Sequence, residues 1–143
     1  MARKAAAKTI RINRATAPAA DLERYCRGLD DWPRSWMGWE KDVPPGEELV
    51  ACFRPFLAYL VMSSDLSPKT IQKHIDNLWL LGGEIIRDLN ETPSLRKKKI
   101  EQMLSDAIAD DGGPLIYGVS SEEQQRSFDS TCRKLHRFLG QPT

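Results

Sequence analysis

Residues 67–89 repeat their apolar side chains with the period of an α-helix. When successive residues step by about 100°, one side of such a helix carries Ile71, Ile75, Leu78, Gly82, Ile85 and Leu89. Ser67 suits an N-cap, and Pro68 then takes the first helical position, where its missing N–H is not needed. Because the pattern stays in phase across Gly82 and Gly83, we predict one continuous or mildly kinked helix to about Leu89. If the helix does not break at these glycines, Gly82 would let another backbone come close to it.

Other segments with helical patterns flank this helix and predict a bundle. They are a short helix over 21–29, an apolar helix from Glu47 that Pro55 should kink, a helix from Thr92 until Gly112 stops it, and a last helix opened by a capping box of Ser120 and Glu123. Residues 8–13 and 114–119 allow one small two-stranded β ribbon. We therefore predict a mainly α fold: a basic N-terminal arm over 1–20, then a single compact bundle of about five helices over 21–143.

The overall charge of the chain excludes a histone-like polycation. Among 143 residues, 21 are Lys or Arg and 20 are Asp or Glu, so the formal net charge is only +1. Any affinity for nucleic acid must therefore come from local clusters of charge. Cys26, Cys52 and Cys132 are far apart and odd in number, which fits reduced thiols better than a disulfide framework. With no run of ~20 apolar residues and no signal-peptide pattern, we expect a soluble, cytoplasmic protein without a membrane partner.

No pattern in the chain indicates catalysis. The sequence lacks P-loop, GxGxxG, GxSxG and DxDxDG motifs. Cys132 and His136 lie one turn apart on the last helix, but Cys132 falls on its apolar side and fits a core residue better than a nucleophile or metal ligand. The acidic pairs 30–31 and 110–111 sit at helix ends, where solvated carboxylates are usual. We expect no enzyme activity, no catalytic residues, no metal and no cofactor.

Basic residues gather in four short clusters. They are Arg3 and Lys4 with three further cations in the arm; Lys69 and Lys73; Arg96, Lys97, Lys98 and Lys99; and Arg133, Lys134 and Arg137. A single cluster of this kind is usually a solvated face. If the clusters converge in the fold, they make a surface for nucleic-acid phosphates. One contiguous positive face would favour DNA, and scattered clusters would favour a protein partner.

Three tryptophans form a second candidate surface. Trp32, Trp36 and Trp39 have helical spacing within a segment that is rich in proline and glycine. We expect a helical turn inside a long loop that lies on the core. Such a trio most often packs into a core, and its alternative role is to anchor a protein partner.

Residues 56–86 contain an F-L-x-Y-L pattern followed by an L-S-x-x-T pattern. The matching residues are Phe56, Leu57, Tyr59 and Leu60, followed by Leu66, Ser67, Thr70, His74 and Leu78. With these patterns, the segment resembles the N-terminal core-binding (SAM-like) domain of tyrosine recombinases and phage integrases. Such domains clamp one side of duplex DNA, mostly through its backbone. The resemblance therefore implies that Lys69, Thr70 and Lys73 contact phosphates. His74 stands where the family has an aromatic residue, and no catalytic domain follows.

Two functions follow from these patterns. The first is a non-catalytic, integrase-like DNA-binding protein from a phage or mobile element, which grips duplex DNA with Lys69, Thr70, Lys73, residues 96–99 and the arm. The second is a protein-interaction module, such as an inhibitor, antitoxin or assembly subunit. That module would use Trp32, Trp36 and Trp39 as its anchor and the basic clusters as its rim.

Overall fold

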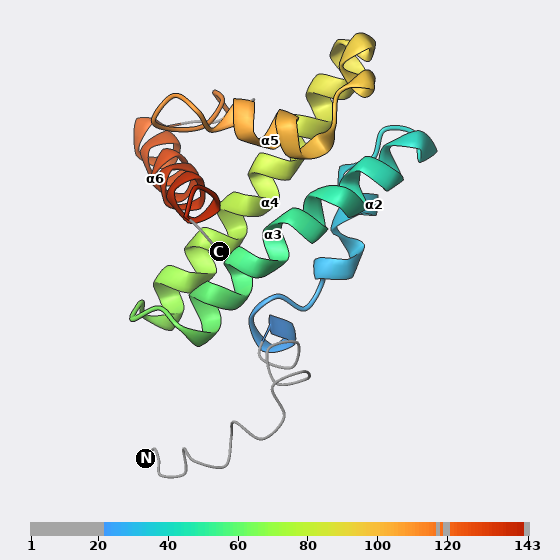
Figure 1. The fold of residues 1–143 in the computed structure, drawn as a ribbon. Coiled ribbons are helices and arrows are strands. Elements are labelled where there is room, and N and C mark those ends of the chain that lie inside the picture. Colours follow the sequence, from blue (N-terminus) through green and yellow to red (C-terminus); the bar gives the residue numbers. More distant parts are fainter. Residues whose placement is uncertain (1–21, 117, 119–120, 142–143) are drawn as a thin grey trace.

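A computed structural model describes residues 22–116, 118 and 121–141 of the chain. The described part is a bundle of helices without a strand, which confirms the predicted mainly α fold (Figure 1). After a helical turn at 22–25, the elements are η2 (Leu29–Asp31), α2 (Trp32–Trp36), η3 (Glu40–Asp42), α3 (Val43–Met62), α4 (Pro68–Glu91), η4 (Pro93–Lys97), α5 (Ile100–Ala107) and α6 (Glu122–Leu139). The helices α3 and α4 form a long pair, and α5 and α6 pack against it.

The helix α4 is continuous from Pro68 to Glu91, as its apolar pattern predicts. The Ser67 side chain caps it by accepting a hydrogen bond from the backbone N–H of Thr70. Gly82 does not break the helix. It is buried under the indole of Trp36, and a Cβ atom at this position would fall inside that ring. The close contact at Gly82 is therefore made by a side chain of α2, and not by another backbone as the sequence suggested.

Apolar side chains from the four longest helices make one core. Those with almost no solvent exposure include Phe53, Phe56, Leu57 and Leu60 from α3, Leu78, Leu81, Ile85, Ile86 and Leu89 from α4, Leu104 from α5, and Phe128 from α6. Burying one side chain of this size is worth about 1.5–3 kcal/mol. The core therefore fixes where each helix places its polar side chains.

Several predicted boundaries are wrong, each for a local reason. The segment after Thr92 is not one helix, because Lys98 and Lys99 adopt extended backbone between η4 and α5. The helix α3 starts at Val43 and not at Glu47, because prolines are accommodated in its first turn. Pro55 lies inside α3 without ending it.

The cap of the last helix lies one residue later than predicted, and part of the predicted ribbon has no regular structure. The N-cap of α6 is Ser121, which accepts a hydrogen bond from the backbone N–H of Gln124, one residue beyond the predicted Ser120 and Glu123 pair. Residues 113–116 have no regular structure, and residues 8–13 lie outside the described part together with the whole basic arm.

Candidate functional site

A buried polar layer joins α4 to α6. The Nδ1 atom of His74 lies 2.7 Å from the hydroxyl oxygen of Thr131, and the Asn77 side-chain amide donates to the same oxygen at 2.8 Å. The Asn77 amide also donates to the Ser127 carbonyl at 3.2 Å. His74 and Asn77 both contact Thr131, and Asn77 also reaches Ser127, so the first half of α4 packs against the middle of α6.

Lysines from both helices surround this layer. Burial lowers the pKa of His74, and the positive charges of Lys134 and Lys73 lower it further. Lys73 adjoins His74 on α4, and Lys134 follows Thr131 by three residues on α6, so the two lysines lie on either side of the contact between His74 and Thr131. Lys69 precedes Lys73 by one turn, and Arg137 follows Lys134 by three residues, so each is the surface neighbour of its lysine. We call Lys69, Lys73, Lys134 and Arg137 the α4–α6 basic face.

Aromatic contacts hold the end of α6 in place. The ring of Phe138 lies 5.4 Å from the ring of Phe56 and 5.4 Å from the ring of Tyr59, both near the end of α3. Phe56 is fully buried, whereas Tyr59 is exposed. The final turns of α6 are therefore packed on α3 while its basic side chains remain at the surface beside α4.

The cations of the α4–α6 basic face are open to a ligand. Lys69, Lys73 and Arg137 are exposed and Lys134 is half-buried. Within the part of the chain that the structure describes, no salt bridge engages any of the four. Thr70, which the resemblance implicates in phosphate contact, is half-buried, and its hydroxyl accepts a hydrogen bond from Ser67 at 3.1 Å. Thr70 therefore serves the cap of α4.

Two other basic residues of α6 are already engaged. Arg133 donates to the backbone carbonyl of Asp111 at 3.0 Å, and Arg126 forms a 3.8 Å ion pair with Glu122. The basic clusters around residues 69–73 and 133–137, which are about sixty positions apart in the chain, are brought together by the fold. The sequence alone did not indicate this pairing.

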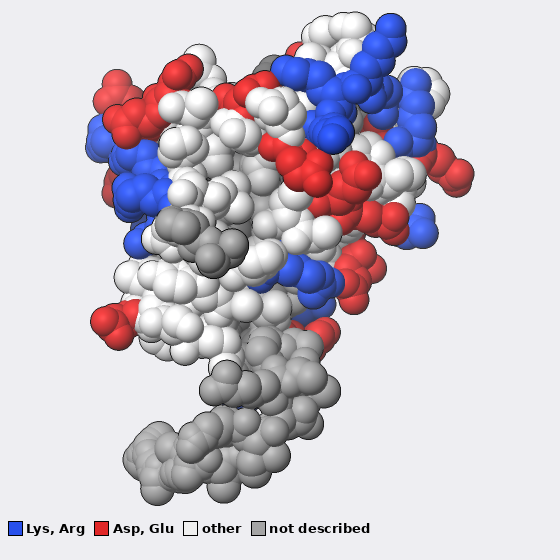
Figure 2. Space-filling view, viewed as in Figure 1, with Lys and Arg blue, Asp and Glu red and all other residues white. Residues whose placement is uncertain are grey.

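The cluster at residues 96–99 lies elsewhere. It follows the other end of α4, and 24 helical residues span about 36 Å. Figure 2 shows basic side chains in separate groups, one beside α6 and one at the upper right where η4 lies in Figure 1, with acidic and neutral side chains between them. Lys98 pairs with Asp106 at 2.9 Å, whereas Lys97 and Lys99 are exposed. Arg3 and Lys4 lie outside the described residues.

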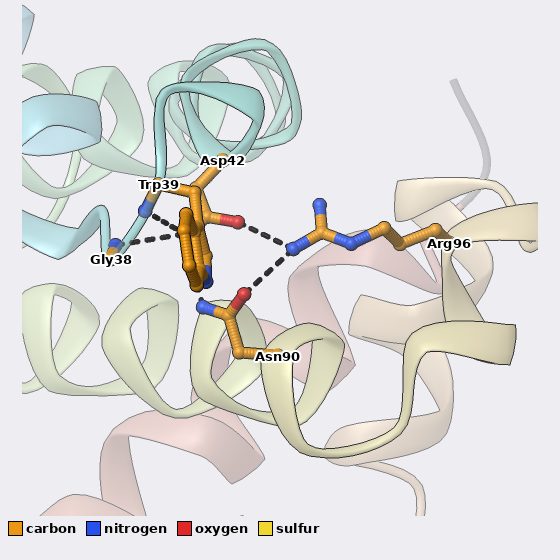
Figure 3. Close-up of polar contacts among 5 residues, drawn as sticks. All are labelled: Gly38, Trp39, Asp42, Asn90 and Arg96. Atoms are coloured by element: carbon orange, nitrogen blue, oxygen red, sulfur yellow. Dashed lines mark hydrogen bonds and ion pairs between the residues drawn. The ribbon is translucent and has the colours of Figure 1, made fainter.

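Arg96 belongs to a buried hydrogen-bond network around Asp42 (Figure 3). The Asp42 side chain has 0% exposure and forms an ion pair of 2.6 Å with the Arg96 guanidinium, which is 23% exposed. The backbone N–H groups of Gly38 and Trp39 donate to Asp42 at 2.8 and 3.0 Å, and the Asn90 amide donates at 3.0 Å. Arg96 also donates to the Asn90 carbonyl oxygen at 2.8 Å. These bonds assign Arg96 a structural role.

The protonation state of Asp42 follows from the same contacts. Burial acts to raise the pKa of this carboxyl, but the hydrogen bonds from Arg96, Asn90, Gly38 and Trp39 outweigh burial and lower the pKa to about 2. The network therefore carries a fixed ion pair at neutral pH. It ties the loop before α3 to the end of α4 and to η4.

The three tryptophans have different environments. Trp32 is buried in the core, and Trp36 packs over Gly82 while its indole N–H donates to the Trp79 carbonyl at 2.9 Å. Only Trp39 of the trio is largely exposed, at 64%, with the Lys41 ammonium 5.8 Å from its ring centre. The expected core packing is confirmed for Trp32, and Trp36 is half-buried and packs against the core. A partner surface on the trio stays a prediction, with Trp39 as its exposed member.

Cys132 and His136, the pair considered for catalysis, differ in their exposure. Cys132 is fully buried, and burial, with a smaller contribution from Asp129, raises the pKa of its thiol to about 12. His136 lies at the surface. In the described segments, no three His, Cys, Asp or Glu side chains are arranged to hold a metal ion, and no helix has the length and apolar character to cross a membrane.

Comparison with known proteins gave no match among protein-family models, curated proteins or solved structures.

Sequence reasoning missed the residues that align the two basic helices. Asn77 lies between Ile75 and Leu78 on α4, and Thr131 lies beside Cys132 on α6. Each is a polar residue on an otherwise apolar side of its helix. A polar residue at a buried helical position needs a hydrogen-bond partner. That requirement is the signal that could have paired these positions.

Proposed function

We propose that this chain is a non-catalytic DNA-binding protein that holds the phosphate backbone of duplex DNA on the α4–α6 basic face. The observation that carries the proposal is the His74–Thr131 contact, which packs the part of α4 that carries Lys69 and Lys73 against the part of α6 that carries Lys134 and Arg137. Cations at fixed positions on two rigid helices suit phosphate contacts, which position a protein on a duplex without reading its sequence.

The resemblance of residues 56–86 to integrase core-binding domains supports the same face, because it implies that the start of α4 meets the DNA backbone. A DNA-binding module of this kind fits a regulator carried by a phage or mobile element. The proposal excludes Arg96, whose guanidinium serves Asp42, and it does not need Lys97, Lys98 or Lys99 at the far end of α4. Arg3 and Lys4 stay a prediction for the arm.

The experiment is the salt dependence of binding to a labelled blunt duplex, followed by fluorescence anisotropy between about 50 and 200 mM salt. Four phosphate contacts give a slope of about −3.6 for log affinity against log salt. The double variant Lys73→Gln/Lys134→Gln should weaken binding and reduce the magnitude of the slope by about 1.8.

A matched control is the double variant Lys97→Gln/Lys99→Gln, which removes the same charge at the far end of α4. It should leave the affinity and the slope nearly unchanged. Equal effects of the two double variants would show that the protein responds to net charge and not to this face. The variant Arg3→Gln/Lys4→Gln measures the contribution of the arm separately.

A protein-interaction function is the second candidate. The exposure of Trp39 favours it, as does the separation of the 96–99 cluster from the α4–α6 basic face, because scattered clusters were the pattern expected for a protein partner. A large aromatic side chain at the surface beside Lys41 and near the Arg96 network is typical of an anchor for a protein partner. Trp39→Ala separates the two functions, because it should leave DNA binding unchanged. A chain that binds no duplex at low salt would favour this second function.

A further inference from the structure

An aromatic groove lies on α4 beside the α4–α6 basic face. This open groove of about 490 Å³ runs between residues 25–32 and the middle of α4, with Tyr25, Trp32 and Trp79 among its walls. Its volume is within the range of about 300–1,000 Å³ that is typical of ligand sites. Trp32 is buried, whereas Trp79 is 40% exposed and presents part of its ring to the groove.

The ring of Trp79 is held in a fixed position. Its indole N–H donates to the Ser35 hydroxyl oxygen at 2.9 Å, and Ser35 in turn donates to the Trp32 carbonyl at 2.7 Å. The backbone carbonyl of Trp79 accepts the indole N–H of Trp36. An exposed indole that is anchored by its own N–H is a rigid platform, and such a platform loses little entropy when a flat ligand stacks on it.

Polar groups line the rim of the same groove. Gln72 and Asp76 lie on α4 and are joined by a hydrogen bond of 3.1 Å from the amide to the carboxylate. This bond leaves the Gln72 carbonyl oxygen and the second Asp76 oxygen as acceptors. Arg27 on the opposite rim is exposed and supplies donors. Acceptors beside an aromatic face suit a planar ligand that carries an amino group.

The position of this groove on α4 indicates which ligand it takes. Lys69 and Lys73 flank Gln72 in the helix, and Asp76 follows Lys73 by three residues. Side chains three or four residues apart on a helix are neighbours, about 5–6 Å apart at Cβ. A phosphate held by Lys69 or Lys73 would therefore place the base attached to it next to the groove.

We infer that this groove binds an unpaired nucleobase of the DNA whose backbone lies on the α4–α6 basic face, with the base stacked on Trp79. The inference rests on the proposed function and names its substrate more closely: a duplex with a single-stranded tail. Stacking on an aromatic side chain accepts any base, and the acceptors of Gln72 and Asp76 favour a base with an exocyclic amino group, adenine, cytosine or guanine, over thymine.

The test compares three labelled ligands by fluorescence anisotropy at one salt concentration. They are a blunt duplex, the same duplex with a tail of three adenines at its 5′ or 3′ end, and the same duplex with a tail of three abasic sites. The abasic tail has the same phosphates without bases, so it isolates stacking from added charge. We expect the adenine tail at one of the two ends to bind about 5- to 150-fold more tightly than the matching abasic tail.

Three variants identify the ring as the cause. Trp79→Leu should abolish the preference for adenine tails, whereas Trp79→Phe should keep most of it, and both lose the bond to Ser35. Ser35→Ala removes that bond but leaves the indole, and it should also keep the preference. All three should bind the blunt duplex as the native chain does, and urea unfolding checks that each variant is folded.

The outcomes separate the inference from the proposed function. Equal affinity for adenine and abasic tails at both ends, with normal binding of the blunt duplex, overturns the groove inference and leaves the proposed function standing. A preference for adenine tails that survives Trp79→Leu also overturns the inference. If no duplex binds at all, the proposed function fails and the inference fails with it.

Discussion

The Asp42 network makes a quantitative prediction about stability. Asp42→Ala removes a carboxylate that accepts hydrogen bonds from two backbone N–H groups, from Asn90 and from Arg96. Leaving a buried donor without a partner costs about 1–3 kcal/mol, and breaking a buried ion pair costs about 3–5 kcal/mol. Because the Arg96 side chain keeps 23% exposure and can regain water, we expect the lower end, about 3–4 kcal/mol.

The pKa of Asp42 gives an independent magnitude for the charge alone. A change from the ordinary value of 3.8 to about 2 in the folded state corresponds to about 2 kcal/mol. The folded pKa is the lower one, so this stabilisation is complete above the unfolded pKa and is lost as the pH falls from about 4 through 2. It is smaller than the effect of Asp42→Ala because a protonated carboxyl still offers an acceptor oxygen.

The assay is urea unfolding at pH 7, repeated between pH 5 and 2. Asp30→Ala is the matched control, because Asp30 pairs with Arg54 at 2.7 Å but with side-chain exposures of 88% and 45%. Exposed pairs of this kind are worth about 0–1 kcal/mol. The reasoning is refuted if Asp42→Ala costs no more than Asp30→Ala, or if a double-mutant cycle with Arg96→Ala finds no coupling.

Two further predictions concern α4. Gly82→Ala should destabilise the protein, because a Cβ atom would overlap the anchored Trp36 ring. The cost of overpacking, about 1–3 kcal/mol, exceeds the gain in helix propensity of about 1 kcal/mol. Gly83→Ala, whose Cβ atom would lie 3.4 Å from the same ring, should be neutral or stabilising in the same urea assay. Burial and nearby lysines lower the folded pKa of His74 below its ordinary 6.5, so the unfolded chain binds the proton first and stability should fall as the pH drops below about 6.5. Urea midpoints from pH 8 to 5 should show this slope in the native chain and a flatter one in His74→Gln, and equal slopes would contradict the assignment.

The sequence predicts the long helix well because its information is local. The apolar stripe, the Ser67 cap and Pro68 all act within a few residues, and α4 has the predicted start and continuity. The segment after Thr92 was predicted less well because its conformation depends on a distant partner. Arg96 donates a hydrogen bond to Asp42, which is 54 positions earlier in the chain, and no pattern in the residues around either position predicts that bond.

The candidate site could be predicted only where it depends on residues close together in the sequence. Lys69 and Lys73 were identified from their outer position on one helix. Lys134 and Arg137 were seen as a cluster, but their pairing with α4 depends on which helices meet and in which direction. The groove at Trp79 was missed entirely, since its walls come from residues 25–32 and from α4 and converge only in the folded chain.

The polar layer between α4 and α6 has a role that apolar packing could not fill. A helix with a wholly apolar contact side can be displaced by a turn or rotated at modest cost, since one aliphatic side chain replaces another with similar contacts. The bonds of Thr131 to His74 and Asn77 are lost in any such displacement, and their groups would then be buried without partners. The layer therefore fixes the register of α6 on α4, and the register decides how far Lys134 lies from Lys73. The buried polar residues of the layer therefore set the spacing of the cations that we propose to contact phosphates.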